Sequence, residues 1–300
     1  MVYSQLDPHF ANYETAEFWE RIRDYRQPDH LDVSYRSIPG VESGSVIEIK
    51  IYRPKLEAAL PMIMNIHGGG FVSGSYENDN NRCTNLALGV PAVVVSLNYR
   101  LAPSATYREA VADCYQTWNW MQAHAGELGG IKGQMGLHGT SAGGNLCAGL
   151  AFYIRDHGGP KVALNALNTP ALGLGSTLSA EQMRFDGPIV KGDGMAENLR
   201  LYAGGLDGGL PSYYAVPNIA RDFSGLPPTL VIAAEFDALR DESTEYVLHL
   251  QKDAIPVEYY VMPRAIHGFT AVQCDMTFWI EEGMCRSFRR EFGRAAEEMS

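Results

Sequence analysis

The sequence predicts an α/β fold with a mostly parallel central sheet flanked by helices. One observation is a series of short apolar runs, at residues 62–66, 92–97, 135–138, 162–167, 229–234 and 257–262. Runs of this length suit strands that are buried on both faces of a parallel sheet. A second observation is that helix candidates separate or follow these runs, near residues 105–123, 142–156, 241–253 and 276–298. Strands and helices that alternate in this order form βαβ units.

The chain before the first apolar run predicts a helical segment and two further strands. Residues 1–30 carry aromatic and aliphatic side chains at helical spacing, a pattern that a proline then interrupts. Residues 33–38 and 45–52 have strand character, and polar residues alternate with isoleucines in the second segment. This alternation predicts a half-exposed antiparallel pair at the edge of the sheet.

Residues 172–224 interrupt the strand and helix rhythm because they are rich in Gly, Ser, Asp and Tyr and longer than an ordinary connection. We expect an insertion above the sheet that joins residues 1–30 in a helical cap over a cleft, with residues 1–300 forming a single domain. Aromatic residues of these parts are candidate walls of the cleft, although packing alone is the commoner role of such residues. The candidates are Phe18, Trp19, Phe71, Tyr213 and Tyr214.

The composition argues against several classes of protein. Hydrophobic residues make up 46% and charged residues 20% of the 300 residues, which is ordinary globular usage. The formal net charge of −11 repels phosphate backbones, so no nucleic-acid partner is expected. The sequence has neither a signal-peptide pattern nor an apolar stretch of about 18 residues, so a cytoplasmic protein with no membrane partner is expected. The five scattered cysteines lack a CxxC pair and favour reduced thiols, and we expect no metal.

The strongest chemical signal is the sequence Gly-Thr-Ser-Ala-Gly at 139–143, which follows a predicted strand and precedes a predicted helix. A serine on a sharp turn between a strand and a helix needs small neighbours, because the strained backbone leaves no room for side chains. This context predicts that Ser141 is a nucleophile. Without that context, a GxSxG match could equally be a glycine-rich turn.

Three consecutive glycines follow the first apolar run, in the sequence His-Gly-Gly-Gly at 67–70. Glycine lets the backbone approach a ligand and direct N–H groups at an oxyanion. We expect the amides of Gly69, Gly70 and Ala142 to form an oxyanion hole. Read alone, the same glycines would indicate a flexible turn at the end of a strand.

A serine nucleophile needs a base and a carboxylate that orients the base. Among eight histidines, His267 is preferred because it follows the last predicted strand, at the sheet edge where parallel sheets bind ligands. Asp237 directly follows the strand predicted at 229–234 and so lies at the same edge. Asp241 and Glu242 instead suit the N-terminus of the next helix. The order Ser, Asp, His along the chain is that of α/β hydrolases.

Two other histidines have structural interpretations. His138 lies on the strand that leads to Ser141 and is expected to be packed or hydrogen-bonded. His67 is expected to support the glycine loop that follows it.

These motifs together resemble the hormone-sensitive-lipase-like branch of bacterial esterases, also called family IV, of the α/β-hydrolase superfamily. The resemblance covers about residues 60–270 and includes four further segments in the same order: NYRLAP at 98–103, SGLPP at 224–228, the block of Asp237 with LRDE at 239–242, and IHGF at 266–269. It implies the α/β-hydrolase fold with an N-terminal helical cap, hydrolysis of short-chain acyl esters without a cofactor, and a homodimer through the last strand of the sheet. Thr140 indicates the threonine-bearing subgroup, while Ser104 and Ala238 replace the usual Glu and Pro.

We therefore expect a serine carboxylesterase that hydrolyses small, fairly apolar esters through an acyl-enzyme intermediate. An amidase, a lactonase or an arylformamidase would use the same three residues on a different acyl bond. A small-molecule-binding protein without catalysis is the alternative from another class.

Overall fold

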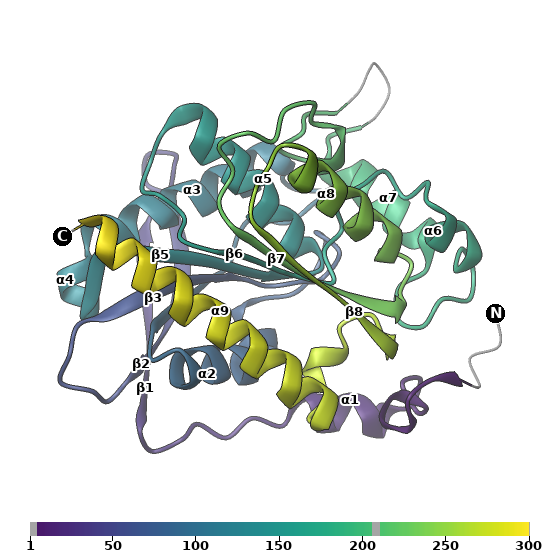
Figure 1. The fold of residues 1–300 in the computed structure, drawn as a ribbon, viewed down its shortest axis with the longest axis horizontal. Coiled ribbons are helices and arrows are strands. Elements are labelled where there is room, and N and C mark those ends of the chain that lie inside the picture. The colour runs from purple at the N-terminus through teal and green to yellow at the C-terminus, as the bar shows by residue number, and fades with distance from the viewer. Residues whose placement is uncertain (1–4, 206–210, 300) are drawn as a thin grey trace.

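The computed structural model describes residues 5–205 and 211–299, and an eight-stranded sheet lies at its centre (Figure 1). The strands are β1 (Leu31–Pro39), β2 (Val46–Pro54), β3 (Leu60–Ile66), β4 (Val93–Leu97), β5 (Gly130–Thr140), β6 (Asn165–Asn168), β7 (Thr229–Phe236) and β8 (Val257–Ile266). Their order across the sheet is β1-β2-β4-β3-β5-β6-β7-β8. The strands from β3 to β8 pair in parallel, and β2 pairs antiparallel with both β1 and β4. The predicted mostly parallel sheet is confirmed.

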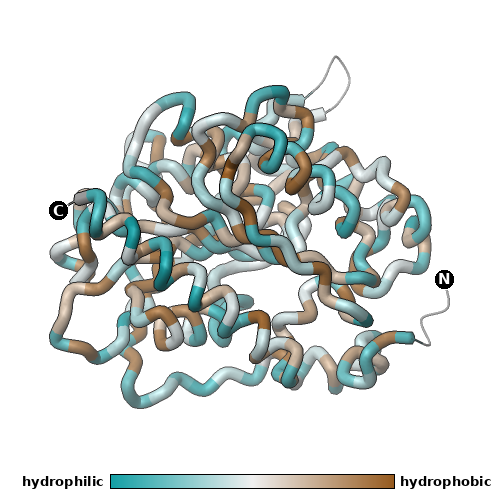
Figure 2. Tube along the Cα trace, viewed as in Figure 1, coloured by the Kyte–Doolittle hydropathy of each residue, from teal (hydrophilic) through white to brown (hydrophobic). Residues whose placement is uncertain are grey.

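Helices cover both faces of this sheet (Figure 1). One face carries α3 (Tyr107–Ala123), α5 (Ala142–His157) and α8 (Arg240–Lys252), and the other carries α2 (Asn80–Gly89) and α9 (Asp275–Met299). Each face has its own cluster of buried apolar side chains, one with α3, α5 and α8 and the other with α1, α2 and α9. Figure 2 shows hydrophobic segments concentrated in the central strands and hydrophilic segments on the outer turns.

Short helices complete the fold. They are α1 (Ala16–Arg23), α4 (Ala125–Leu128), α6 (Leu178–Gln182) and α7 (Gly192–Tyr202). Single 3₁₀ turns occur at Pro8–Phe10, Tyr76–Asp79, Pro217–Ile219 and Phe269–Ala271. None of the helices in the described part of the chain has both the length and the apolar composition that a bilayer span requires.

Local sequence explains why the main elements begin and end where they do. β4 consists mainly of valine, whose branched side chain suits a pleated strand, and all five of its residues are buried. At the start of α3, Glu109 Oε2 accepts from the N–H of Thr106 at 2.7 Å, and Thr106 Oγ1 accepts from an N–H in the first turn. This reciprocal pair is a capping box. α5 ends at His157, and Gly158 after it has a positive φ of 85°.

Three details differ from the sequence prediction. The strand expected at 162–167 begins three residues later, because the chain reaches the sheet where Leu137 pairs with Asn165. α2 was not predicted at all. Lys50 is buried and not half-exposed, because α2 packs on β2 and the Lys50 ammonium donates to Glu77 and Asn80, both at 2.7 Å.

The insertion at 172–224 contains α6 and α7, and α6 packs on both α8 and α7 (Figure 1). Five of its residues, 206–210, fall outside the described part of the chain. The N-terminal segment contributes α1, which packs below the sheet on the face that carries α2 and α9. The two expected parts of the cap therefore lie on different sides of the sheet edge where β5, β7 and β8 end.

Candidate active site

The three predicted side chains stand at the carboxyl ends of three parallel strands. Ser141 follows β5 and immediately precedes α5, Asp237 follows β7, and His267 follows β8. Only the short strand β6 separates β5 from the adjacent pair β7 and β8. Because parallel strands end at the same edge of a sheet, residues that are distant in sequence meet there.

A continuous chain of hydrogen bonds joins the three side chains. His267 Nε2 lies 3.0 Å from Ser141 Oγ, and His267 Nδ1 lies 2.8 Å from Asp237 Oδ2. The other carboxylate oxygen of Asp237 accepts from the N–H of Leu239 at 2.9 Å. Asp237 is 1% exposed, so solvent screens the interaction between its carboxylate and the imidazole only weakly. An imidazole held in this way can accept the serine proton and stay oriented while it is charged.

The backbone at Ser141 has the strained conformation that its glycine neighbours permit. Ser141 has φ +59° and ψ −120°, which is unusual for a residue with a side chain. A Cβ atom at Gly139 would lie 2.3 Å from the carbonyl oxygen of Gly143, and one at Gly143 would lie 2.0 Å from that of Ile66. Both positions therefore require glycine, as the GxSxG interpretation predicted.

The glycine loop lies directly against this turn. A Cβ atom at Gly68 would lie 3.3 Å from the Cβ atom of Ser141, and Gly69 and Gly70 have φ of +124° and +61°. At the start of α5, the N–H of Ala142 has no partner within its own helix. The glycine loop and the N-terminus of α5 therefore both lie next to Ser141.

His67 supports the loop, as predicted. Its Nδ1 lies 2.7 Å from the carbonyl oxygen of Gly68, and its ring stacks on Tyr99 at 4.4 Å between centroids. Burial lowers the pKa of His67, which favours the neutral imidazole. His138 is packed as predicted: it is fully buried, and its Nδ1 lies 2.7 Å from Asn65 Oδ1.

Asp241 and Glu242 lie in the first turn of α8, as the sequence predicted, but neither side chain forms a capping hydrogen bond there. Glu242 accepts from the N–H groups of Leu172 and Gly175 at 3.0 and 2.8 Å. Asp241 accepts from the N–H of Ser179 at 2.8 Å. Both carboxylates therefore hold the insertion onto α8, and burial raises the pKa of Glu242 to about 7.

Asn168, at the end of β6, connects the two halves of the site. Its carbonyl oxygen accepts from the N–H of Ser141 at 2.9 Å, and its side-chain amide donates to Thr270 Oγ1 at 2.6 Å. Thr270 lies three residues after His267 on the loop that follows β8. Sequence reasoning missed Asn168 because an asparagine at the end of a strand forms no recognisable motif.

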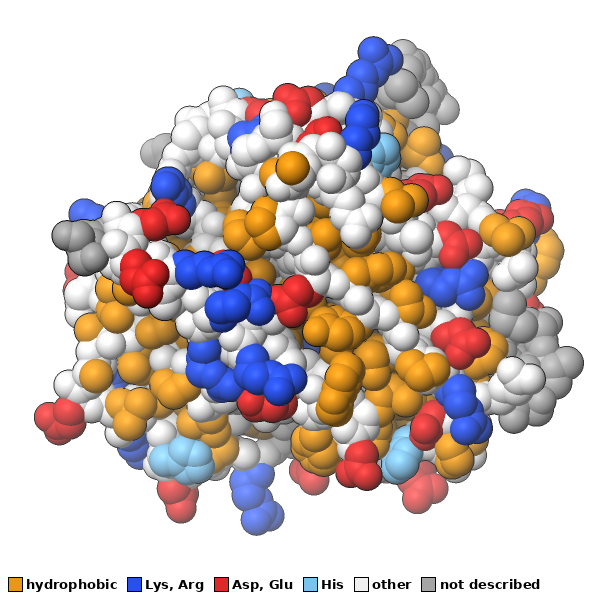
Figure 3. Space-filling model, viewed as in Figure 1, with side chains coloured by type: hydrophobic (Ala, Val, Ile, Leu, Met, Phe, Trp, Pro, Cys, Tyr) orange, Lys and Arg blue, Asp and Glu red, His pale blue; other side chains and the backbone are white. Residues whose placement is uncertain are grey.

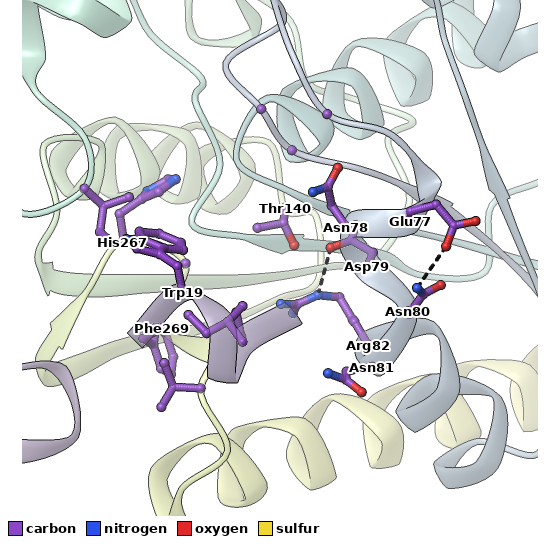
Figure 4. Close-up of a pocket in the computed structure, with 18 of the residues that line it drawn as sticks. Trp19, Glu77, Asn78, Asp79, Asn80, Asn81, Arg82, Thr140, His267 and Phe269 are labelled. Atoms are coloured by element: carbon purple, nitrogen blue, oxygen red, sulfur yellow. Dashed lines mark hydrogen bonds and ion pairs between the residues drawn. The ribbon is translucent and has the colours of Figure 1, made fainter. Parts of the chain in front are cut away.

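A cavity of about 620 Å³ opens beside His267 and the glycine loop (Figure 4). Apolar side chains supply one wall: Phe18, Trp19, Ile22, Ile189, Phe269 and Val272. Polar side chains line another part: Glu77, Asn78, Asp79, Asn80, Asn81 and Arg82. The polar residues come from α2 and the 3₁₀ turn before it, which sequence reasoning did not connect with the site.

Two of the five aromatic residues proposed from sequence line the cavity, namely Phe18 and Trp19. The other three lie elsewhere because each has its own packing partner. Phe71 is fully buried and stacks on Tyr202 at 4.0 Å between centroids. Tyr213 and Tyr214 both donate to Asp156, at 2.8 and 2.9 Å.

Comparison with known proteins identifies the family of this fold. A sequence model of the α/β-hydrolase fold family matches residues 63–271. The chain is an α/β hydrolase. The hydrolase is 32% identical to esterase LipI of Mycobacterium tuberculosis over 254 residues, which cover 83% of the hydrolase and 79% of the relative. It is 31% identical to an arylesterase of Saccharolobus solfataricus, with 74% of the hydrolase and 72% of the relative covered.

Solved structures agree with the sequence relatives. A bacterial heroin esterase superposes on the hydrolase with a TM-score of 0.88 at 29% identity, covering 97% of the hydrolase and 99% of that chain. A hyperthermophilic esterase of the archaeon Pyrobaculum calidifontis has a TM-score of 0.83 at 34% identity, covering 93% and 88%. The predicted membership in the hormone-sensitive-lipase-like branch is confirmed.

Proposed function

We propose that the hydrolase is a serine carboxylesterase that cleaves short-chain, fairly apolar esters through Ser141, His267 and Asp237. Its family and its esterase relatives make it a carboxylic ester hydrolase. The observation that carries the proposed mechanism is the hydrogen-bonded order of hydroxyl, imidazole and carboxylate, with contacts of 3.0 and 2.8 Å.

In the first step, His267 Nε2 accepts the proton of Ser141 while Oγ attacks the ester carbonyl carbon. The negative charge that develops on the carbonyl oxygen is stabilised by the amides of Gly69, Gly70 and Ala142. His267 then donates the proton to the leaving alcohol, which leaves an acyl group on Ser141. Asp237 keeps Nδ1 protonated and stabilises the charged imidazole throughout.

In the second step, His267 accepts a proton from water, and the resulting nucleophile attacks the acyl carbon. The tetrahedral oxyanion forms again against the same amides. Proton return to Oγ then releases the carboxylic acid and restores the enzyme. In both steps His267 Nε2 moves the proton, while Nδ1 stays hydrogen-bonded to Asp237.

The size and lining of the cavity support a small substrate. A volume of about 620 Å³ accommodates a compact ligand, and much of the wall beside His267 is apolar. α1 contributes Phe18, Trp19 and Ile22 to that wall, and the insertion contributes Ile189 from the other side. This shared lining supports the proposal that the N-terminal segment and the insertion form a cap within one domain. An acyl chain of a few carbons would replace water along Phe18 and Trp19.

Replacement of Ser141 by alanine tests the proposal. Hydrolysis of p-nitrophenyl butyrate by Ser141→Ala should fall by at least about 10³-fold, because the nucleophile is lost. Ser104→Ala changes an exposed serine and serves as the matched control, with its rate unchanged. An organophosphonate should label the wild-type protein at Ser141, as read by peptide mass spectrometry. Undiminished turnover by Ser141→Ala would remove this residue from the mechanism.

Rates on an ester and its matched anilide separate an esterase from an amidase. The proposal expects much faster cleavage of p-nitrophenyl butyrate than of p-nitrobutyranilide. Faster cleavage of the anilide would assign the same three residues to amide hydrolysis.

We propose further that two copies of the chain dimerise through β8. β8 is the last strand of the sheet, and Val261 on it is exposed, as are Phe278 and Trp279 of α9. The ring of Tyr260, next to Val261, packs against that of Trp279 at 5.7 Å between centroids. Hydrophobic side chains gather over these elements in Figure 3. Addition of a second β8 would satisfy the free edge and cover the apolar surface. Val261→Arg should convert the dimer to a monomer in sedimentation, whereas an unchanged mass would contradict this interface.

We also propose a cytoplasmic location. All five cysteines are buried and none forms a disulfide, as reduced thiols would be. Fractionation of cells that express the natural gene would test the location.

A further inference from the structure

Arg82 lies inside the cavity that opens beside His267, although it belongs to α2 on the far side of that space (Figure 4). Only 5% of the residue is exposed. Its side chain extends from α2 toward the part of the cavity that α1 covers (Figure 4). The N–H groups of a guanidinium that is buried in this way need hydrogen-bond acceptors.

The guanidinium of Arg82 lacks acceptors. Its Nε and Nη1 atoms are buried, and neither donates to any acceptor in the described residues. The carboxylate of Asp79 is near, but its Oδ1 lies 3.8 Å from Nε, which is too far for a hydrogen bond. The other oxygen of Asp79 accepts from the side-chain amide of Asn65 at 3.1 Å.

The charge of Arg82, in contrast, is already balanced. Asp79 is its ion-pair partner at 3.8 Å. The buried carboxyl group of Glu281 is a second acidic neighbour: burial raises its pKa, while the charge of Arg82 and a hydrogen bond from Asn85 oppose that rise. A further negative charge would meet two acidic groups. The site lacks hydrogen-bond acceptors and does not lack negative charge.

Donors of a buried guanidinium that stay without acceptors are costly, and native proteins rarely leave them so. We propose that the cavity end formed by Arg82 binds an uncharged oxygen acceptor, foremost a carbonyl group, at the end of the substrate remote from the ester that is cleaved. This inference rests on the proposed esterase function and names a substrate class for it.

The lining between His267 and Arg82 defines the rest of that substrate. Trp19 of α1 lies between His267 and Arg82 in Figure 4, and Phe18 of the same helix also lines the cavity. An apolar spacer therefore separates the scissile ester from the remote carbonyl. Keto esters and diesters with a short aliphatic spacer have this pattern.

The test compares p-nitrophenyl esters of equal shape. The set consists of hexanoate, 5-oxohexanoate and 5-methylenehexanoate, with the keto and methylene groups also placed at carbon 4 of hexanoate and at carbon 6 of heptanoate. A methylene group has the shape of the carbonyl but accepts no hydrogen bond. Loss of a hydrogen bond to a charged donor weakens binding by about 10- to 100-fold. At least one keto ester should therefore have a kcat/KM that exceeds that of its methylene partner by this factor.

A second arm places the carbonyl in the alcohol. It compares 4-oxopentyl acetate with 4-methylenepentyl acetate, and a preference in either arm supports the proposal. The monoester of glutaric acid reports on charge, since its terminal carboxylate should be a poorer substrate than the keto esters. A preference for that carboxylate over every keto ester would overturn the assignment of an uncharged acceptor.

Arg82→Met should reduce the ratio of the kcat/KM of each keto ester to that of its methylene partner to about 1, because the donors of the guanidinium are lost. Arg82→Lys, which keeps the charge and one set of donors, should retain an intermediate ratio. The control Arg108→Met changes an exposed arginine on the opposite face and should leave the ratio unchanged. If Arg82→Met fails to fold, the keto-to-methylene ratios of the wild type and of Arg82→Lys still test the proposal.

Equal wild-type rates for all keto and methylene pairs would overturn the inference. That outcome is distinct from failure of the proposed function, in which p-nitrophenyl hexanoate itself would not be cleaved in a manner that depends on Ser141.

Discussion

Replacement of Glu242 by glutamine should remove a specific part of the pH dependence of stability. Glu242 is 1% exposed, and burial raises its pKa from 4.5 to about 7. The folded protein therefore binds more protons than the unfolded chain between these two pH values. The protonated carboxyl group of Glu242 therefore contributes to the free energy of unfolding. This contribution is fully present below pH 4.5 and is lost as the pH rises through about 7.

A rise of the pKa of Glu242 from 4.5 to about 7 corresponds to a change of about 3 kcal/mol in the free energy of unfolding across the full pH range. Between pH 5 and pH 8, where urea unfolding can be followed by circular dichroism, about 2 to 3 kcal/mol of this change should be seen. Because glutamine does not titrate, the free energy of unfolding of wild type minus that of Glu242→Gln should fall by this amount as the pH rises.

Glu245→Gln provides the matched control, since Glu245 is an exposed glutamate on the same helix. The free energy of unfolding of wild type minus that of Glu245→Gln should stay constant over the same pH range. A constant difference for Glu242→Gln as well would refute the reasoning. It would mean that the two backbone N–H groups that bind the carboxylate offset the cost of its burial completely.

Two other substitutions test the geometry of the site. Asp237→Asn should lower kcat for p-nitrophenyl butyrate by about 10³- to 10⁴-fold with little change in the melting temperature, because the amide holds the wrong imidazole tautomer; a loss below tenfold would contradict the orienting role. Gly143→Ala should destabilise the fold by more than about 3 kcal/mol in urea unfolding, because its Cβ would lie 2.0 Å from the carbonyl oxygen of Ile66; a variant as stable as wild type would show that the turn relaxes without cost.

The candidate site was predictable because its residues occupy positions that chain order alone specifies. Ser141 lies between a recognisable strand and helix, and Asp237 and His267 directly follow strands with strong apolar patterns. Parallel pairing then brings these three strand ends to one edge. No side-chain packing had to be known for that conclusion.

The wall of the cavity was predictable only in part, because it depends on packing between distant segments. Phe71 looked accessible beside the glycine loop, yet stacking on Tyr202 turns it into the core. Arg82 was missed because its helix was missed. In that helix, Cys83, Leu86 and Ala87 do have the spacing of a buried face, but the asparagines around them favour turns.

The boundary of β6 shows a different limit. The apolar run at 162–167 predicted a strand, but pairing with β5 begins only at Asn165. Strand ends are set by the partner strand as well as by local composition, so a pattern within one segment cannot locate them.

The bridging position of Asn168 has a practical consequence for enzyme engineering. Libraries that vary only residues in contact with the substrate would not include it, although Asn168 accepts from the N–H of Ser141 and donates to Thr270, on the loop that carries His267. We expect substitutions along the four-residue strand β6 to alter turnover by shifting one half of the triad against the other. Such changes would slow or speed both acylation and deacylation for every substrate, and selectivity between substrates would stay the same.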